Sequence, residues 1–127
     1  MSTLNTKVKT PPIYLDLTHL QQISEGDTAF ECEILLIYLR EVPEIVRQTQ
    51  QALKGRDYLE AANLIHVLKS KIRVVGLKQA WRLADFIEIN LRKKTNLNQL
   101  GSKIEIFFKI IRKSIFLVNK ELLKSTK

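Results

Sequence analysis

Glycine and proline are scarce in this chain, and their scarcity limits the folds open to it. The 127 residues include four glycines and three prolines, about half of what average usage would give. Both residue types build turns and interrupt helices. A turn-rich β-sandwich is therefore disfavoured and a few long helices are favoured. A chain of this length is expected to form one domain with one hydrophobic core.

Apolar residues recur every three or four positions in five segments, which indicates amphipathic helices. Asp16, Asp27 and Asp57 stand where N-caps are expected, and Gly55 and Gly76 stand where helices end. The predicted helices cover about residues 16–26, 27–54 with a kink near Pro43, 57–75, 78–93 and 100–123, and residues 95–99 are expected to form a polar loop.

This pattern predicts an all-α fold, an up-and-down antiparallel four-helix bundle with a short extra helix at the N-terminus. Residues 1–12 are polar and read as a flexible arm, whereas residues 13–127 are assigned to the bundle. Five aromatic residues at helical spacing are expected in the core: Trp81, Phe86, Phe107, Phe108 and Phe116.

Positive charge is concentrated in the second half of the chain. Residues 1–65 hold six Lys/Arg and nine Asp/Glu, whereas residues 66–127 hold fifteen Lys/Arg and four Asp/Glu. A basic half suggests an anionic partner, which could be a nucleic acid, a membrane surface or an acidic protein. The single cysteine, Cys32, excludes a disulfide framework and favours a cytoplasmic, reducing compartment. No apolar run reaches membrane-span length, and no signal peptide is recognisable.

His66 is the strongest candidate for a chemically active residue. A helical wheel of segment 57–75 groups the apolar residues in one stripe and places His66 about 130° from its centre, toward solvent. Lys69 and Arg73 lie on or beside the same face, and Ser70 follows one turn later. The wheel shows no carboxylate beside the imidazole.

Few activities suit such a histidine. A metal site needs further ligands at suitable spacing, and a catalytic triad needs a paired nucleophile and an orienting carboxylate. Neither pattern is present around His66. The patch does suit a phosphoryl carrier, because a neutral imidazole is a nucleophile and nearby cations can offset the charge of a phosphoryl group. The residues alone favour an ordinary surface histidine and leave the phosphoryl carrier as the alternative.

Segment 66–76, HVLKSKIRVVG, resembles the H-x-L-K-G-x-x-x-x-x-G signature of histidine-containing phosphotransfer (HPt) domains. Residues 52–57, ALKGRD, are similar to the A-L-x-x-x-D lead-in of that family. Further on, residues 76–77, 83–84 and 87–88 are similar to its G-A-x-x-L-A-x-x-x-x-L-E segment. The resemblance extends over about residues 15–123.

The resemblance implies a phosphorelay carrier that is not an enzyme and has no ATP site or autokinase activity. His66 would accept a phosphoryl group through Nε2 from the aspartate of one receiver domain and pass it to the aspartate of another. Lys69 would stabilise the phosphoryl charge and Gly76 would end the histidine helix. No metal or cofactor is expected on this chain, because the receiver would supply Mg²⁺. Serine at position 70 departs from the family's glycine, and isoleucine at position 65 from its alanine.

The implied partners are response-regulator receiver domains and a hybrid histidine kinase, with the chain expected to be a monomer that binds neither nucleic acid nor membrane. No recognition helix with base-reading side chains is visible. The alternative function is an adaptor that binds and sequesters a response regulator without accepting phosphoryl. The residues expected to form the receiver-docking face are Ala62, Asn63, Val67, Ser70, Arg73 and Val74.

Overall fold

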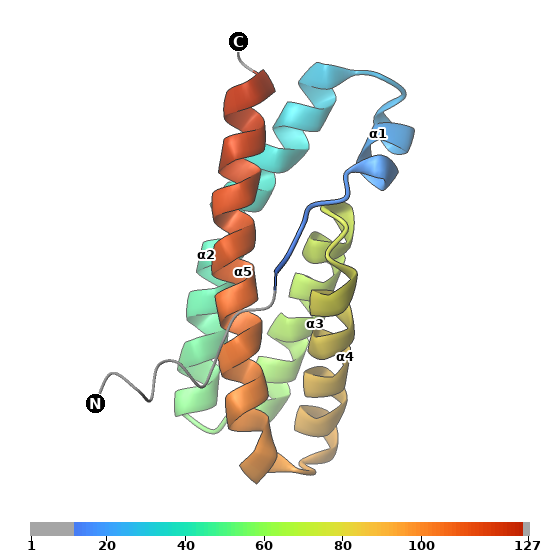
Figure 1. The fold of residues 1–127 in the computed structure, drawn as a ribbon. Helices are drawn as coiled ribbons and strands as arrows, with labels where there is room; N and C mark the ends of the chain where they lie inside the picture. The colour runs from blue at the N-terminus through green and yellow to red at the C-terminus, as the bar shows by residue number, and fades with distance from the viewer. Residues whose placement is uncertain (1–11, 126–127) are drawn as a thin grey trace, which may run out of the picture.

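The computed structural model describes residues 12–125, and these residues form five α-helices without a strand. The all-α prediction is therefore confirmed (Figure 1). The predicted arm, residues 1–12, lies outside the described residues except for Pro12. The helices are α1 (Thr18–Ser24), α2 (Thr28–Lys54), α3 (Tyr58–Val74), α4 (Lys78–Lys93) and α5 (Leu97–Ser125).

The four long helices form an antiparallel bundle in which α2 packs on α3, α3 on α4, α4 on α5 and α5 on α2. Helices α2 and α5 are much longer than α3 and α4. They project beyond the other two at one end of the bundle, where α1 packs against α2 (Figure 1). Within the part of the chain that the structure describes, no helix is both long and apolar enough to cross a membrane.

Aspartate side chains fix the starts of the second and third helices. Asp27 Oδ1 accepts a hydrogen bond from the backbone N–H of Phe30 at 3.0 Å, and Asp57 Oδ1 accepts one from Glu60 at 3.2 Å. Helix α2 then continues unbroken past Pro43. The predicted start of the last helix is wrong, because α5 begins at Leu97 and takes in residues that were expected to form a loop.

The core stripe of α3 consists of fully buried residues, among them Ile65, Leu68 and Ile72. Two of the five aromatic residues predicted in the core lie outside it: Phe86 is 40 % exposed and Phe116 is 58 % exposed. Each is adjacent in sequence to an inward-facing aliphatic residue. A shift of one residue turns a side chain by about 100° around the helix, away from the core.

Residues 12–17, the N-terminal strap, run from the side of α5 across the loop between α3 and α4 (Figure 1). The backbone N–H of Asp16 donates to the carbonyl of Val75 at 3.0 Å. Beside this contact, Gly76 has a φ of +74°, and a Cβ atom there would lie 2.2 Å from the carbonyl oxygen of Asp16. Only glycine fits both this conformation and this close approach.

Candidate functional site: a histidine supported by a buried carboxylate

His66 lies in the middle of α3, and its side chain is 66 % exposed, as the helical wheel predicts. The interpretation that no carboxylate lies beside it is wrong. Glu88 reaches the imidazole from the neighbouring helix α4, and its Oε2 atom lies 3.1 Å from Nδ1 of His66. A wheel of α3 alone contains no information about a carboxylate that α4 provides.

The contact with Glu88 distinguishes the two ring nitrogens of His66. An ionised carboxylate can only accept a hydrogen bond, so Nδ1 of a neutral imidazole at this distance must carry the proton. The other nitrogen, Nε2, then keeps its lone pair. The neutral form of this solvent-exposed imidazole therefore carries its free lone pair on Nε2.

Glu88 is the centre of a small ionic cluster and is only 9 % exposed. Besides His66, its carboxylate accepts hydrogen bonds from Lys69 Nζ at 3.0 Å and from Arg92 Nε at 2.9 Å. Burial disfavours the charged carboxylate, but the hydrogen bonds from Lys69, Arg92 and His66 outweigh it and hold the pKa of Glu88 below its usual range. Glu88 is thus ionised at neutral pH.

Lys69 is more enclosed than its place near the exposed face of α3 suggests, since its side chain is 12 % exposed. Its ammonium group lies 2.7 Å from Asp85 Oδ1 and 4.6 Å from the ring centre of Trp81. Burial favours the neutral amine, yet the hydrogen bonds to Asp85 and Glu88 prevail and raise the pKa of Lys69. Lys69 therefore keeps a fixed positive charge three residues after His66.

The six residues predicted to form the docking face are not all on the surface. Ala62 is fully buried, so its predicted place on the docking face is wrong, and Val74 is half-buried against the core. Helix α3 packs on both α2 and α4, and two neighbours bury a wider face than one apolar stripe indicates. The residues that do lie on the exposed side of α3 are Asn63, Val67, Ser70 and Arg73.

Two of these exposed side chains already form hydrogen bonds within the chain. Asn63 Oδ1 accepts a hydrogen bond from Arg92 at 2.9 Å, which links the face to the Glu88 cluster. Ser70 Oγ donates to the carbonyl of Val67 at 2.7 Å, one turn earlier in its own helix. Val67 itself is 42 % exposed. The surface around His66 thus combines small, apolar and amide groups, and Arg73 supplies one peripheral cation.

Sequence reasoning missed Glu88, Asp85 and Arg92 as site residues. Glu88 lies in a segment that resembles the HPt family, but its pairing with the imidazole depends on how α4 packs against α3. Among residues 12–125, no group of three or more His, Cys, Asp or Glu side chains is arranged to hold a metal ion.

Fold and site together define an all-α bundle with one exposed histidine whose Nδ1 faces a buried carboxylate. The sequence model of one family, described as the Hpt domain, matches residues 33–115, which is more than half of the chain. The chain belongs to the Hpt domain family, whose members are phosphotransfer carriers in phosphorelays and not kinases. Searches of curated proteins and of solved structures found no match.

Proposed function

We propose that His66 is the phosphoacceptor of this carrier. In the forward step the lone pair of Nε2 attacks the phosphorus of an aspartyl phosphate on a receiver domain. The N–P bond forms as the P–O bond to the aspartate breaks, and the aspartate leaves as a carboxylate with the electron pair. The reverse step, toward the aspartate of a second receiver, returns the lone pair to Nε2. The observation that supports this assignment is the 3.1 Å contact between His66 Nδ1 and Glu88.

Glu88 has two effects on this step. It keeps the proton on Nδ1, so that Nε2 is the nucleophile. When Nε2 bonds to phosphorus while Nδ1 remains protonated, the ring gains a positive charge. The carboxylate of Glu88 lies beside this charge and stabilises it. Fixed charges of this kind act strongly where they lie next to the charge that develops during the reaction.

Lys69 is proposed to offset the negative charge of the phosphoryl group. Its ion pairs with Asp85 and with Glu88, the carboxylate that contacts the ring, hold its ammonium group in place. Phosphoryl transfer depends mainly on positioning and electrostatic stabilisation. In this proposal, the chain provides the nucleophile, its orienting carboxylate and one fixed cation, and the receiver provides Mg²⁺ and its acidic ligands.

The receiver is proposed to dock on the exposed side of α3, over Asn63, Val67, Ser70 and Arg73. One such receiver would belong to a hybrid histidine kinase and another to a response regulator. The small side chain of Ser70 leaves the approach to the ring open. An acidic receiver surface also complements the basic second half of the chain.

The test is uptake of labelled phosphoryl from a phosphorylated receiver by the wild-type chain and by His66→Gln. We expect the wild type to be labelled and His66→Gln to stay unlabelled, with a change in unfolding free energy of less than about 0.5 kcal/mol because the position is exposed. His19→Gln, which removes the other histidine, should be labelled normally. Incubation with ATP alone should label neither protein.

Two results would contradict the proposal. Labelling of His66→Gln at the wild-type rate would show that another residue is the acceptor. Tight binding of one receiver, together with no phosphoryl transfer to the chain from any receiver encoded in the same genome, would indicate the sequestering adaptor instead.

A further inference from the structure

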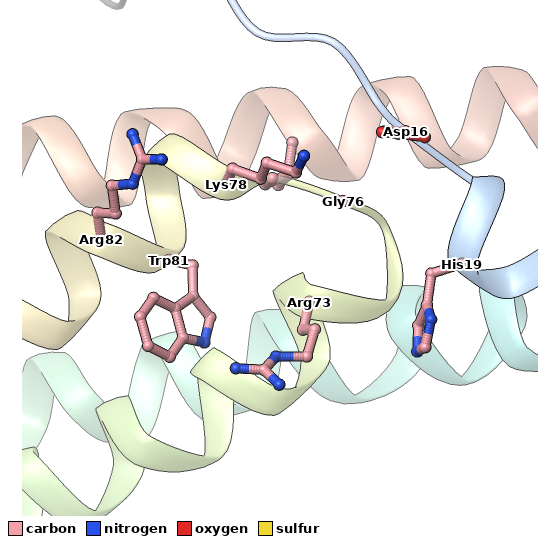
Figure 2. Close-up of a pocket in the computed structure, with 8 residues that line it drawn as sticks. Asp16, His19, Arg73, Gly76, Lys78, Trp81 and Arg82 are labelled. Atoms are coloured by element: carbon pink, nitrogen blue, oxygen red, sulfur yellow. The ribbon is translucent and has the colours of Figure 1, made fainter.

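A cavity of about 470 Å³ opens beside the phosphoacceptor site, where the end of α3, the start of α4 and α1 come together (Figure 2). It is distinct from the exposed imidazole of His66, which is not among its lining residues. Small-molecule sites commonly have volumes of about 300–1,000 Å³. The side chains that line it include four basic groups, one indole and one carboxylate: His19, Arg73, Lys78, Arg82, Trp81 and Asp16.

Among the described residues, the three permanently charged cations of this cavity form no close ion pair, although the charge of Lys78 acts on the Asp16 carboxylate. Within residues 12–125, Arg73, Lys78 and Arg82 form no salt bridge, whereas Lys69, which contacts the same indole as Arg73, is paired with Asp85 and Glu88. Arg73 instead lies against Trp81, with its guanidinium carbon 5.2 Å from the ring centre (Figure 2). Three cations without a close ion pair around one hollow produce a positive potential that favours an anion.

Helix α4 adds to this potential. Its first residue, Lys78, lies in the cavity wall, and its N-cap residue, Leu77, has no side-chain oxygen to accept from the first-turn N–H groups. The positive end of the helix dipole therefore lies at the wall of the same hollow. Lys78 and Arg82 are one turn apart on this helix, so both can reach one ligand.

Asp16 is the only carboxylate in the described lining, and it opposes an anion. Hydrogen bonds from Thr18, including the one from its backbone N–H at 3.1 Å, hold the carboxylate, and they and the charge of Lys78 keep its pKa below the ordinary value. Against three cations, this single negative charge leaves the cavity with a net positive charge. The negative charge of Asp16 also lowers the affinity of the cavity for an anion, and a substitution that removes this charge should raise that affinity.

We infer that this cavity binds a small anion that carries two or more phosphate groups. Arginine and lysine are the side chains that bind phosphate oxygens best, arginine through its planar fork of N–H donors. The cavity volume fits a single small molecule. Two kinds of ligand share this chemistry: a short inorganic polyphosphate and a nucleoside polyphosphate. Only the nucleoside polyphosphate has a planar base, which it would place near Trp81.

The two sites share Trp81. The indole contacts Arg73 of the cavity and, at 4.6 Å, the ammonium group of Lys69 of the phosphoacceptor site. The inference does not rest on phosphoryl transfer by His66, and it is tested by binding alone.

Trp81 is the only tryptophan of the chain, so its fluorescence reports on the cavity without mutation. The experiment titrates the full chain with pyrophosphate, with ATP and with adenosine, all without Mg²⁺. We expect a saturable change in Trp81 emission with pyrophosphate and ATP and none with adenosine beyond its own absorption. Tighter binding of ATP than of pyrophosphate would identify the nucleoside polyphosphate as the preferred source, and the reverse order would identify inorganic polyphosphate.

Charge substitutions locate the binding. Arg82→Gln and Lys78→Gln should each raise Kd about three- to fivefold, and the double variant about tenfold, because exposed charge pairs contribute modestly. Asp16→Asn should lower Kd about twofold, since asparagine keeps an oxygen that can accept from Thr18 N–H and loses the charge. The matched control is Lys93→Gln, which removes the same charge at the opposite end of α4, and it should change Kd less than twofold.

Several outcomes would overturn the inference. One is an unchanged Trp81 emission with pyrophosphate and ATP up to about 10 mM, a concentration at which even millimolar affinity would be visible. Equal weakening by Lys93→Gln and Arg82→Gln would indicate general attraction to a basic chain. A Trp81 response to an acidic receiver but to neither small anion, lost in the Lys78/Arg82 double variant, would assign the cavity to a protein interface.

Discussion

Glu88 Oε2 lies 3.1 Å from Nδ1 of His66 although the two residues belong to different helices. The carboxylate is buried, whereas two thirds of the imidazole is exposed. Glu88 therefore meets the ring from the bundle side and leaves its outer edge open to a partner. The packing of α4 against α3 thus determines which ring nitrogen is available for chemistry.

The first prediction concerns the role of this carboxylate. Glu88→Ala should slow phosphoryl uptake about tenfold or more, because loss of the orienting partner lets the proton occupy either ring nitrogen. Glu88→Gln should be intermediate, since its carbonyl oxygen can still accept from Nδ1–H but carries no charge. The measurement is the single-turnover rate at saturating phospho-receiver.

A spectroscopic readout separates orientation of the ring from simple packing. In ¹⁵N NMR spectra, neutral His66 should be the Nδ1–H tautomer in the wild type and a mixture in Glu88→Ala. Transfer at the wild-type rate by both variants, with the tautomer unchanged, would mean that Glu88 only holds α3 and α4 together.

The second prediction is a pH dependence of stability. The pKa of Glu88 is held below its ordinary value of 4.5, so the unfolded chain binds more protons in this range. The stabilisation is fully present above pH 4.5 and is lost as the pH falls through the lower pKa of the folded state. Glu88→Gln should therefore be about 1–3 kcal/mol less stable than the wild type at pH 7, and the gap should narrow below pH 4.5.

Urea unfolding between pH 3 and about 7 measures this gap. Glu105→Gln serves as the control, because it removes an exposed carboxylate of α5, and it should follow the wild type throughout. A gap for Glu88→Gln that stays constant down to pH 3 would mean that the ionised carboxylate is not what stabilises the fold.

The helices were largely predictable because their signals are local. Asp27 and Asp57 cap their own helices, and the apolar stripe of α3 depends only on spacing along one segment. The start of α5 was missed because polar residues flank Leu97 and indicate a loop, although Leu97 continues the apolar spacing of Leu100 and Ile104 and packs against the core. Local chemistry therefore defines most helix bounds without knowledge of the tertiary fold.

The site was only half predictable because it is shared between two helices. The exposure of His66 follows from α3 alone, and the structure agrees. Glu88 is 22 residues away, and its contact with His66 depends on the rotation of α4 about its axis. Ala62 was misplaced for the same reason, since burial on α3 depends on both neighbouring helices. A wheel of one helix cannot represent either relationship.

The third prediction concerns the strap across Gly76. Gly76→Ala should destabilise the fold by more than about 2 kcal/mol, because a Cβ atom there would meet the carbonyl oxygen of Asp16 at 2.2 Å and the φ is +74°. Gly26→Ala is the matched control. Its φ is +87° but nothing lies within 4 Å of the new Cβ, so it should cost only about 1 kcal/mol.

The measurement is the unfolding free energy of Gly76→Ala, Gly26→Ala and Gly101→Ala by thermal and urea unfolding. Gly101 is helical and open, so alanine there should stabilise the chain by about 0.5–1 kcal/mol. Equal losses for Gly76→Ala and Gly26→Ala would show that the strap moves aside freely and that only the backbone conformation matters.

The last prediction concerns Ser70, where the sequence departs from the glycine of the HPt signature. Ser70 is exposed one turn after His66, and its hydroxyl donates to the carbonyl of Val67 at 2.7 Å. Ser70→Gly should lower stability by about 0.5–1 kcal/mol through the flexibility of glycine in a helix and leave transfer within a few-fold. Ser70→Leu should keep the fold but strongly slow transfer, because a larger side chain fills the approach of the receiver to the imidazole. Phosphoryl uptake and thermal melting are measured for both variants, with Ser70→Ala as the control of small size that lacks the hydroxyl. Uptake by Ser70→Leu at the wild-type rate would show that the receiver does not dock over this side of α3, and the proposed docking face would then be wrong.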